Sequence, residues 1–344
     1  MKIWSGFPAL AAAAFMTGLP ANPPAWGADA APFDQSPYER PASLVEVGDG
    51  QRLNLVCRGE GFPTVLLEAG FGESAVTWRD VQPEIAKVTR VCAYDRAGLG
   101  FSDPARAAQD VAGMAARLRA LVDAGGIGRP FVLVAHSMGG LIAARYADEN
   151  PRDLAGLVLV DPAVAHQERH MAAVTRSYFI ANAQQRAVIL ACLDAAKAGD
   201  MTPGSSLPAE CGNPTPGAGP VLAAAESARM KKVSYWEALL SEHENMFSMQ
   251  EDSSTVDDIQ LTGSTRRYGT LPLIVLTAGN ALPDMPEAEK DPANTLWMKL
   301  HDELAARSDR GVNRLAPQSG HYIQNDAPQE VIAAVLEVVT ATRR

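Results

Sequence analysis

The sequence predicts an α/β fold in which eight strands form an open, mostly parallel sheet covered by helices on both faces. Short β-rich runs alternate with longer helical stretches, and the later runs are nearly continuous in Val, Ile and Leu, as is typical of parallel strands buried on both faces. About 110 residues separate the run that ends at Asp161 from the run that begins at Leu271, far more than an ordinary crossover needs. This interval predicts a helical cap inserted after the sixth strand.

The first two strands are predicted to form a hairpin, because Gly48, Asp49 and Gly50 separate them. The eight predicted strands are 43–47, 52–57, 64–70, 90–95, 131–136, 154–161, 271–279 and 311–317. Helical patterns occupy 109–124, 139–150, 293–308 and 328–340, and in the cap helix-like stretches near 164–198 and 218–250 flank a Pro- and Gly-rich break at 202–220.

The N-terminus has the features of a secretory signal peptide. Lys2 precedes an apolar run over 3–19, and Ala25 and Gly27 are small residues of the kind that signal peptidase prefers. The alternative is an uncleaved membrane anchor, but the run is shorter than the roughly 20 residues of a spanning helix and is interrupted by glycine and proline. We therefore expect a secreted or periplasmic protein. Its predicted divisions are a signal peptide at 1–27, a leader at 28–42, a core at 43–161 and 270–344, and a helical cap at 162–269.

The net charge limits which partners the protein can bind, and the cysteine content indicates its cellular compartment. The 344 residues carry a formal net charge of −10, and no block of Lys and Arg stands out. This composition argues against a nucleic acid or an anionic membrane as partner. We expect no stable membrane insertion, and the oligomeric state stays open. Four cysteines in an exported chain predict two disulfides, for which composition leaves three pairings open.

One predicted strand runs directly into a serine and then a helix. The run FVLVAH is followed by Ser137, Met138, Gly139 and Gly140, which is the strand–turn–helix context of a nucleophile elbow. A serine on so tight a turn needs small residues two positions away on each side, and here these are Ala135 and Gly139. An ordinary loop serine is the alternative, but the strand and helix around it favour Ser137 as a nucleophile.

A serine hydroxyl is a poor nucleophile without a base, and the chain has six histidines. In chains that have a nucleophile elbow, the base follows the last strand of the sheet, and His321 lies at that position. His136 adjoins the nucleophile, but strand alternation predicts that it points away, so we assign it a structural role. His166 and His170 are spaced as zinc ligands can be, yet the stretch lacks the H-E-x-x-H pattern and a nearby third ligand. We expect surface positions for both, and neither a metal nor another cofactor.

An oxyanion hole requires two backbone N–H groups aimed at the developing alkoxide. Met138, the residue after the nucleophile, is expected to supply one of them. Phe71, in the loop after the third strand, is expected to supply the other, because Gly70 and Gly72 permit a sharp backbone path there. A plain turn is the alternative interpretation of this loop.

Three motifs resemble those of the lid-bearing members of the α/β-hydrolase superfamily. YDRAGLGFSD (94–103) resembles the loop after the fourth strand, AHSMGG (135–140) the nucleophile elbow, and SGHYIQNDAPQEV (319–331) the histidine loop with the final helix. The resemblance covers about residues 43–342 and implies the α/β-hydrolase fold with the sheet order 1-2-4-3-5-6-7-8.

The implied sheet order bears on the cysteines. It places the second strand antiparallel beside the fourth, so that Cys57 faces Cys92. Cys192 and Cys211 would then close a small loop inside the cap. Four free thiols are the alternative.

Two positions depart from the family pattern and leave the catalytic acid open. Ala69 stands where many members have the histidine of an H-G pair, and the loop after the seventh strand lacks the usual G-x-x-D motif. We predict Asp161 as the acid, because it ends the sixth strand beside the nucleophile strand and some members carry the acid there. The alternatives are Asp284, the first carboxylate after the seventh strand, and an Asp161 that only caps the turn into the cap.

The resemblance implies acyl transfer, because epoxide hydrolases and haloalkane dehalogenases of this fold use a carboxylate where this chain has Ser137. We predict a serine hydrolase that cleaves small-molecule carboxylic esters or lactones through an acyl-enzyme intermediate. One alternative is a prolyl-aminopeptidase-like peptidase, which would need a cap carboxylate such as Glu237, Glu242 or Glu244 for the substrate amine. A non-catalytic binding protein is the other. The cap side chains that could line an apolar pocket or form the cap core are Tyr178, Phe179, Tyr235, Trp236, Met246 and Phe247.

Overall fold

The computed structural model describes most of the chain after the leader. The described residues are 34–201, 211–212, 214–215, 217–248, 254–263, 267–282 and 285–343. The predicted signal peptide at 1–27 lies outside them. Within these ranges, no helix is both long and apolar enough to cross a membrane.

Eight strands form one sheet in the order β1-β2-β4-β3-β5-β6-β7-β8, as the family resemblance implies. β2 pairs antiparallel with β1 and with β4, and all other neighbouring strands are parallel. The predicted fold class is therefore confirmed. The strands are β1 (Leu44–Glu46), β2 (Arg52–Arg58), β3 (Val65–Glu68), β4 (Val91–Tyr94), β5 (Phe131–His136), β6 (Leu154–Val160), β7 (Leu273–Asn280) and β8 (Gly311–Gly320).

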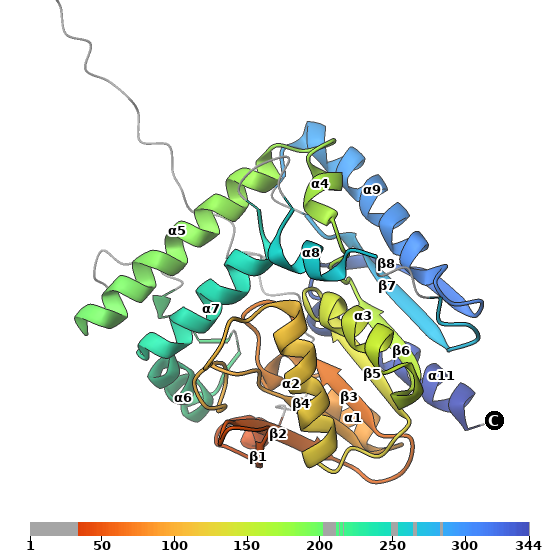
Figure 1. Cartoon of the computed structure of the whole chain (residues 1–344), viewed down its shortest axis with the longest axis horizontal. Coiled ribbons are helices and arrows are strands. Elements are labelled where there is room, and N and C mark those ends of the chain that lie inside the picture. Colours follow the sequence, from red (N-terminus) through yellow and green to blue (C-terminus); the bar gives the residue numbers. More distant parts are fainter. Residues whose placement is uncertain are drawn as a thin grey trace, which may run out of the picture.

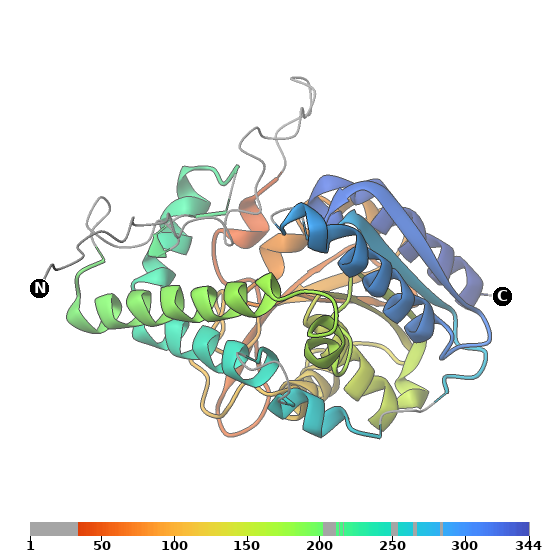
Figure 2. The ribbon, with the colours of Figure 1, turned by 90° about the horizontal axis from the view of Figure 1, so that it is seen from above.

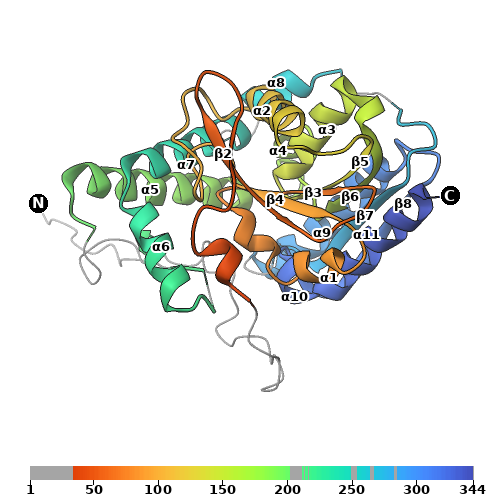
Figure 3. The ribbon, with the colours of Figure 1, turned by 90° about the horizontal axis from the view of Figure 1, so that it is seen from below.

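Helices cover both faces of the sheet (Figure 3). α2 (Val111–Ala124) and α3 (Gly139–Glu149) lie on one face, and α1 (Gln82–Ala86) and α11 (Pro328–Thr342) lie on the other. Along β5, Val132 and Val134 pack toward α11, whereas Leu133 and Ala135 pack toward α2 and α3. Because every second side chain enters one core and the rest enter the other, the strand is apolar throughout, as buried parallel strands are.

Most elements match their predicted ends to within two residues, and two differ by more. α9 (Glu287–Ala305) begins six residues before the predicted start at 293, and Pro292 lies inside it. Proline removes one backbone hydrogen bond there, but Glu287 and Glu289 in the first turn favour the helix through its dipole. β8 runs on to Gly320, so His321 follows the strand directly.

Between β6 and β7 the chain forms the helices α4 (Gln167–Met171), α5 (Ser177–Ala198), α6 (Pro220–Met230), α7 (Val233–Met246) and α8 (Val256–Leu261), which we call the cap. α5 and α7 lie side by side and extend beyond the sheet (Figures 1 and 2). They share a small apolar core that includes Ile189, Leu193, Trp236 and Leu239.

Both predicted disulfides are present and no cysteine is free. Cys57 and Cys92 are directly opposite each other in the antiparallel register of β2 and β4, with their Cα atoms 4.0 Å apart. Cys192 on α5 is bonded to Cys211, with a Cα–Cα distance of 5.2 Å. One bridge therefore joins two strands of the sheet, and the other fixes a loop to the longest cap helix.

We expect the double variant Cys192→Ser/Cys211→Ser to unfold at a lower temperature than the wild type. The bridge closes a loop over a sequence separation of 19 residues, for which loop entropy gives a stabilisation of about 3 kcal/mol. Thermal unfolding measures the loss, and non-reducing peptide mapping checks the pairing first. A peptide linking Cys57 to Cys192 or Cys211 would contradict this connectivity.

Candidate active site

Ser137 occupies a strained turn between β5 and α3. Its φ is +50°, a left-handed conformation that non-glycine residues rarely adopt outside sites where the surroundings enforce it. A Cβ on Gly139 would lie 2.9 Å from the carbonyl oxygen of Ala69, and one on Gly140 would lie 2.5 Å from Cβ of Pro162. The two glycines are thus required for the close approach of α3 to its neighbours.

The structure brings Ser137, His321 and Asp161 together. His321 Nε2 lies 2.9 Å from Ser137 Oγ, and His321 Nδ1 lies 2.6 Å from Asp161 Oδ2. Each of the three residues stands at the carboxyl end of a strand or just beyond it. The alternative acid, Asp284, lies outside the described residues. The hydroxyl, the imidazole and the carboxylate form one hydrogen-bonded chain, as in a Ser-His-Asp triad.

Asp161 is fully buried and fixed by more than the histidine. Its φ is +40°, so the backbone here is also left-handed. Oδ1 accepts hydrogen bonds from the backbone N–H of Ala278 at 2.9 Å and from the indole Nε1–H of Trp297 at 3.0 Å. These two donors occupy one oxygen and direct the other toward His321.

Charge and burial act in opposite directions on both members of this pair. Burial acts to raise the pKa of Asp161, but the hydrogen bond and charge of His321, together with the charge of His301 and the N–H of Ala278, hold the pKa below its usual range. Burial acts to lower the pKa of His321, but the hydrogen bond and charge of Asp161, with the more distant charge of Glu73, raise it above its ordinary value. The pair is arranged to stabilise an imidazolium.

The loop 69–72 after β3 contains the predicted oxyanion residue Phe71. The N–H of Gly70 donates to Glu73 Oε2 at 2.6 Å, and the N–H of Gly72 donates to Glu242 Oε2 at 2.8 Å. Within the described residues, the N–H groups of Phe71 and Met138 have no acceptor. Of the amides at 70–72, only that of Phe71 thus remains for a ligand.

His136 does not simply point away from the site, contrary to our expectation. Its ring is buried, and the centroids of the His136 and His321 rings are 4.8 Å apart. Nδ1 is 2.9 Å from Glu73 Oε2, and Nε2 is 3.1 Å from the backbone oxygen of His321. Burial acts to raise the pKa of Glu73, but His136 and the Gly70 N–H lower it overall. His136 and Glu73 therefore join the loop 69–72 to the backbone of His321.

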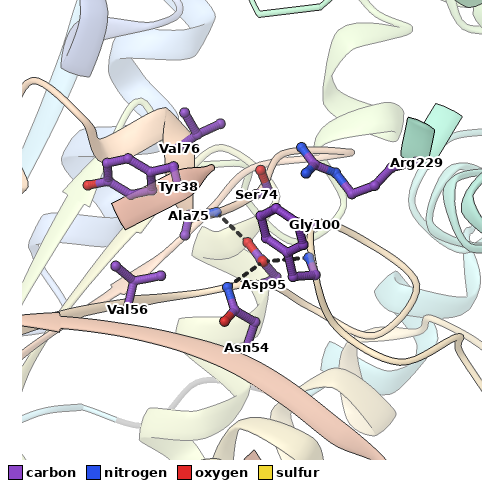
Figure 4. A pocket seen from close by; sticks show the side chains of 10 residues that line it. Tyr38, Asn54, Val56, Ser74, Ala75, Val76, Asp95, Gly100 and Arg229 are labelled. Atoms are coloured by element: carbon purple, nitrogen blue, oxygen red, sulfur yellow. Dashed lines mark hydrogen bonds between the residues drawn. The ribbon is translucent and has the colours of Figure 1, made fainter. Parts of the chain in front are cut away.

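Sequence reasoning assigned no role to Asp95 and Arg96 in the YDRAGLGFSD motif. Figure 4 shows the Asp95 carboxylate at a small cavity, where it accepts hydrogen bonds from Asn54 Nδ2 and the backbone N–H of Ala75. It also accepts from the N–H of Phe101 at 2.8 Å. Asp95 thereby fixes the loop 95–103 against the segment that follows the loop 69–72.

The cap residues singled out by the sequence occupy different environments. Phe179, Trp236 and Met246 are buried in the cap and at its boundary with the core. Phe247 is half-buried and packs edge-on against Phe71, with ring centroids 5.5 Å apart. The Phe247 ring therefore contacts the loop 69–72.

The two histidines with ligand-like spacing are not close to a set of further ligands. His166 Nδ1 is 3.8 Å from Asp258 Oδ1, and His170 is exposed. The described part of the chain holds no group of three or more His, Cys, Asp or Glu side chains that could bind a metal ion.

Comparison with known proteins agrees with this geometry. Residues 63–197 match the family model described as the alpha/beta hydrolase fold. The uncharacterized protein YqjL of Bacillus subtilis is 25% identical over 281 residues, which cover 82% of this chain and 85% of YqjL. The strand order, the elbow and this match together show that the chain has the α/β-hydrolase fold.

Solved structures show the same fold. An alpha/beta hydrolase fold protein from Burkholderia ambifaria is similar with a TM-score of 0.56 and 19% identity, covering 87% of this chain and 99% of that one. A thermophilic esterase from Thermogutta terrifontis is similar with a TM-score of 0.53 and 18% identity, covering 88% and 98%. At these identities the likeness concerns the fold.

Proposed function

We propose that the protein is a serine hydrolase that cleaves carboxylic esters or lactones through an acyl-enzyme intermediate. The observation that carries the proposal is the chain of contacts from Ser137 Oγ to His321 Nε2 at 2.9 Å and from His321 Nδ1 to Asp161 Oδ2 at 2.6 Å. The Ser-His-Asp arrangement activates a hydroxyl for attack on an acyl carbon. The family match supports hydrolysis in general, and the triad supports the acyl substrate.

The reaction follows from the positions of these groups. Ser137 Oγ attacks the carbonyl carbon while His321 Nε2 accepts the hydroxyl proton, and Asp161 stabilises the imidazolium. The N–H groups of Phe71 and Met138 donate to the oxyanion of the tetrahedral intermediate. His321 then protonates the departing alkoxide, and an acyl group remains on Ser137. Water, deprotonated by His321, releases the acid by the same steps in reverse.

A peptidase of the prolyl-aminopeptidase kind is less well supported, because two of its three candidate carboxylates already have cationic partners. Glu242 is buried against Arg96, with Oε1 2.8 Å from the arginine Nε. Glu244 is exposed and accepts a hydrogen bond from Arg186 Nε at 3.0 Å. A substrate ammonium would have to displace an arginine at either position. The exposed Glu237 is the third candidate.

A panel of substrates separates these functions. p-Nitrophenyl esters of graded chain length should be hydrolysed, and the chain-length dependence of kcat/KM measures the acyl pocket. Proline anilides should not be cleaved at a comparable rate. Anilide hydrolysis faster than that of every ester would favour the peptidase, and a protein inert to both panels and to a fluorophosphonate would favour a binding role.

We expect kcat/KM for ester hydrolysis to fall as the pH drops below the pKa of His321. The base must be neutral to accept the serine proton, so activity is present above that pKa and lost below it. Because Asp161 and Glu73 raise this pKa, the acidic limb should lie above the ordinary histidine value of about 6.5. The profile is measured at the isosbestic wavelength of p-nitrophenol, since the product itself titrates. A limb well below pH 6 would contradict the assignment of His321.

We also propose that the protein works outside the cytoplasm after removal of residues 1–27. Two disulfides support an oxidising compartment. Its core would comprise 43–161 and 270–344 and its cap domain 162–269. Mass spectrometry of the protein recovered from the exported fraction tests the cleavage site.

A further inference from the structure

We propose that Arg96 and Glu242 are positioning residues that hold the oxyanion loop 69–72 in its working conformation, so that cap helix α7 supplies part of the support for transition-state stabilisation. This inference rests on the proposed serine hydrolase function. It assigns Glu242 a role in the reaction that does not involve contact with substrate.

Arg96 binds the part of the loop that precedes Phe71. Its guanidinium is 3% exposed. Nη1 donates to the carbonyl oxygen of Ala69 at 2.7 Å, and Nη2 donates to that of Gly70 at 2.5 Å. The same guanidinium contacts Glu68 Oε1 at 2.9 Å and Glu242 Oε1 at 2.8 Å. The planar donor fork of arginine thus fixes two consecutive carbonyl groups just before Phe71.

Glu242 binds the other side of the loop from the cap. It lies on α7, 146 residues beyond Arg96 in the chain, and its side chain is fully buried. While Oε1 accepts from Arg96, Oε2 accepts the N–H of Gly72 at 2.8 Å. One carboxylate therefore ties the residue after Phe71 to the arginine that holds the residues before it.

These contacts leave the Phe71 amide as the donor for the site. Ala69 and Gly70 present their carbonyl oxygens to Arg96, and the N–H groups of Gly70 and Gly72 are taken by Glu73 and Glu242. The peptide groups on both sides of the Phe71 N–H are fixed, so its direction is fixed as well. An oxyanion donor must be held within about 0.5 Å of its working position to be effective.

The energetics favour positioning over stabilisation as the purpose of the cluster. Two carboxylates and a guanidinium are removed from water here, and a buried ion pair often stabilises a fold no better than apolar side chains of the same volume. Burial acts to lower the pKa of Arg96, but Glu242 and Glu68 raise it far above its usual range. The guanidinium is therefore charged and can hold both carbonyls. Tyr94 completes the cluster, because its hydroxyl group donates a hydrogen bond to Glu68.

The test is Glu242→Gln, with Glu244→Gln on the same helix as its matched control. Glutamine keeps the shape but has one acceptor oxygen, so either Arg96 or the Gly72 N–H loses its partner and the loop shifts. Removal of an oxyanion donor costs roughly 10²–10³-fold in kcat, and displacement should cost about 10–10²-fold, with KM changed less than threefold. Glu244 is exposed and contacts Arg186, away from the loop, so its variant should retain wild-type kinetics.

A second measurement separates positioning from a merely structural role. A trifluoromethyl ketone forms a hemiketal with Ser137 whose oxyanion occupies the hole, so its affinity should fall in parallel with kcat/KM in Glu242→Gln. The acidic limb of the pH profile should stay in place, because His321 and Asp161 are untouched. A variant with a lower Tm but wild-type kcat and ketone affinity would overturn the inference.

Two outcomes keep this inference distinct from the proposed function. If the wild type neither hydrolyses esters nor reacts with a fluorophosphonate, the proposed function fails. If the wild type is active and Glu242→Gln is folded and equally active, only the positioning role fails. Should Glu242→Gln not fold, Arg96→Lys decides, since it keeps the charge and loses the fork. In Arg96→Lys, both kcat and the affinity for the trifluoromethyl ketone should fall. Unchanged values for both would overturn the inference.

Discussion

Ser137→Ala is expected to abolish ester turnover, with a loss of at least about 10⁴-fold in kcat, because the members of a triad act as a unit. The hydroxyl is the atom to which His321 Nε2 is hydrogen-bonded, and no other hydroxyl contacts that nitrogen in the described residues. Alanine lacks that hydroxyl and should still fit, since β5, the elbow and α3 depend on backbone contacts and on small neighbours. The fold should therefore remain intact while the chemistry is lost.

The serine prediction is checked by kinetics and by covalent labelling. A fluorophosphonate should modify the wild type at Ser137 alone and leave Ser137→Ala unmodified. Ser74→Ala is a suitable control, because Ser74 is a half-buried serine beside the oxyanion loop whose hydroxyl makes no hydrogen bond within the described residues. It should retain activity and labelling. A Ser137→Ala protein with a tenth of wild-type activity would remove this residue from the mechanism.

The strands were predictable because burial on both faces leaves a local signal. β5 coincides with its predicted range, since an unbroken apolar run ends at the elbow. Such runs do not predict the order of the strands in the sheet. That order was inferred from the resemblance to the α/β-hydrolase superfamily. α9 shows where local rules mislead, because a helix that starts before Pro292 can continue through it when its first turn is favourable. The short helices α1 and α8 have too few residues to show a clear period.

The candidate site likewise contains some residues that local sequence patterns locate and others that they do not. Ser137, His321 and Asp161 follow the ends of strands, so the alternation of elements locates them and the structure places them in contact. Glu242 carries no comparable signal. Its partner Arg96 lies 146 residues earlier, and only the packing of α7 against the core brings them together. Glu73 and His136 lie close in sequence to Phe71 and Ser137, respectively. Their contact with each other, however, depends on the pairing of β3 with β5.

Asp161→Asn is expected to lower kcat by roughly 10³–10⁴-fold, the range seen when the acid of a triad is neutralised. The change keeps the shape of a fully buried side chain, so its effect should reach activity more than folding. Circular dichroism and thermal unfolding establish that the variant is folded before kinetics are compared.

The geometry around Asp161 explains why the loss should be so large. Oδ1 accepts from two donors, the N–H of Ala278 and the indole N–H of Trp297. An asparagine must therefore place its oxygen there and turn its NH₂ group toward His321. Because an amide NH₂ donates, His321 Nδ1 would have to be the acceptor and Nε2 would carry the proton. A protonated Nε2 cannot accept the proton of Ser137, so the base would be held in the wrong tautomer.

The same argument distinguishes Asp161 from Asp284 as the acid. Asp284→Asn should lower kcat less than tenfold, because the Nδ1 position of His321 is already taken by Asp161 at 2.6 Å. The pH profile adds a second criterion. Loss of the Asp161 charge removes the main influence that raises the pKa of His321, so the residual activity of Asp161→Asn should show an acidic limb shifted to lower pH, whereas Asp284→Asn should keep the wild-type limb. If Asp284→Asn lost the greater part of kcat and shifted the limb, Asp284 would be the acid. Asp161 would then only anchor the end of β7.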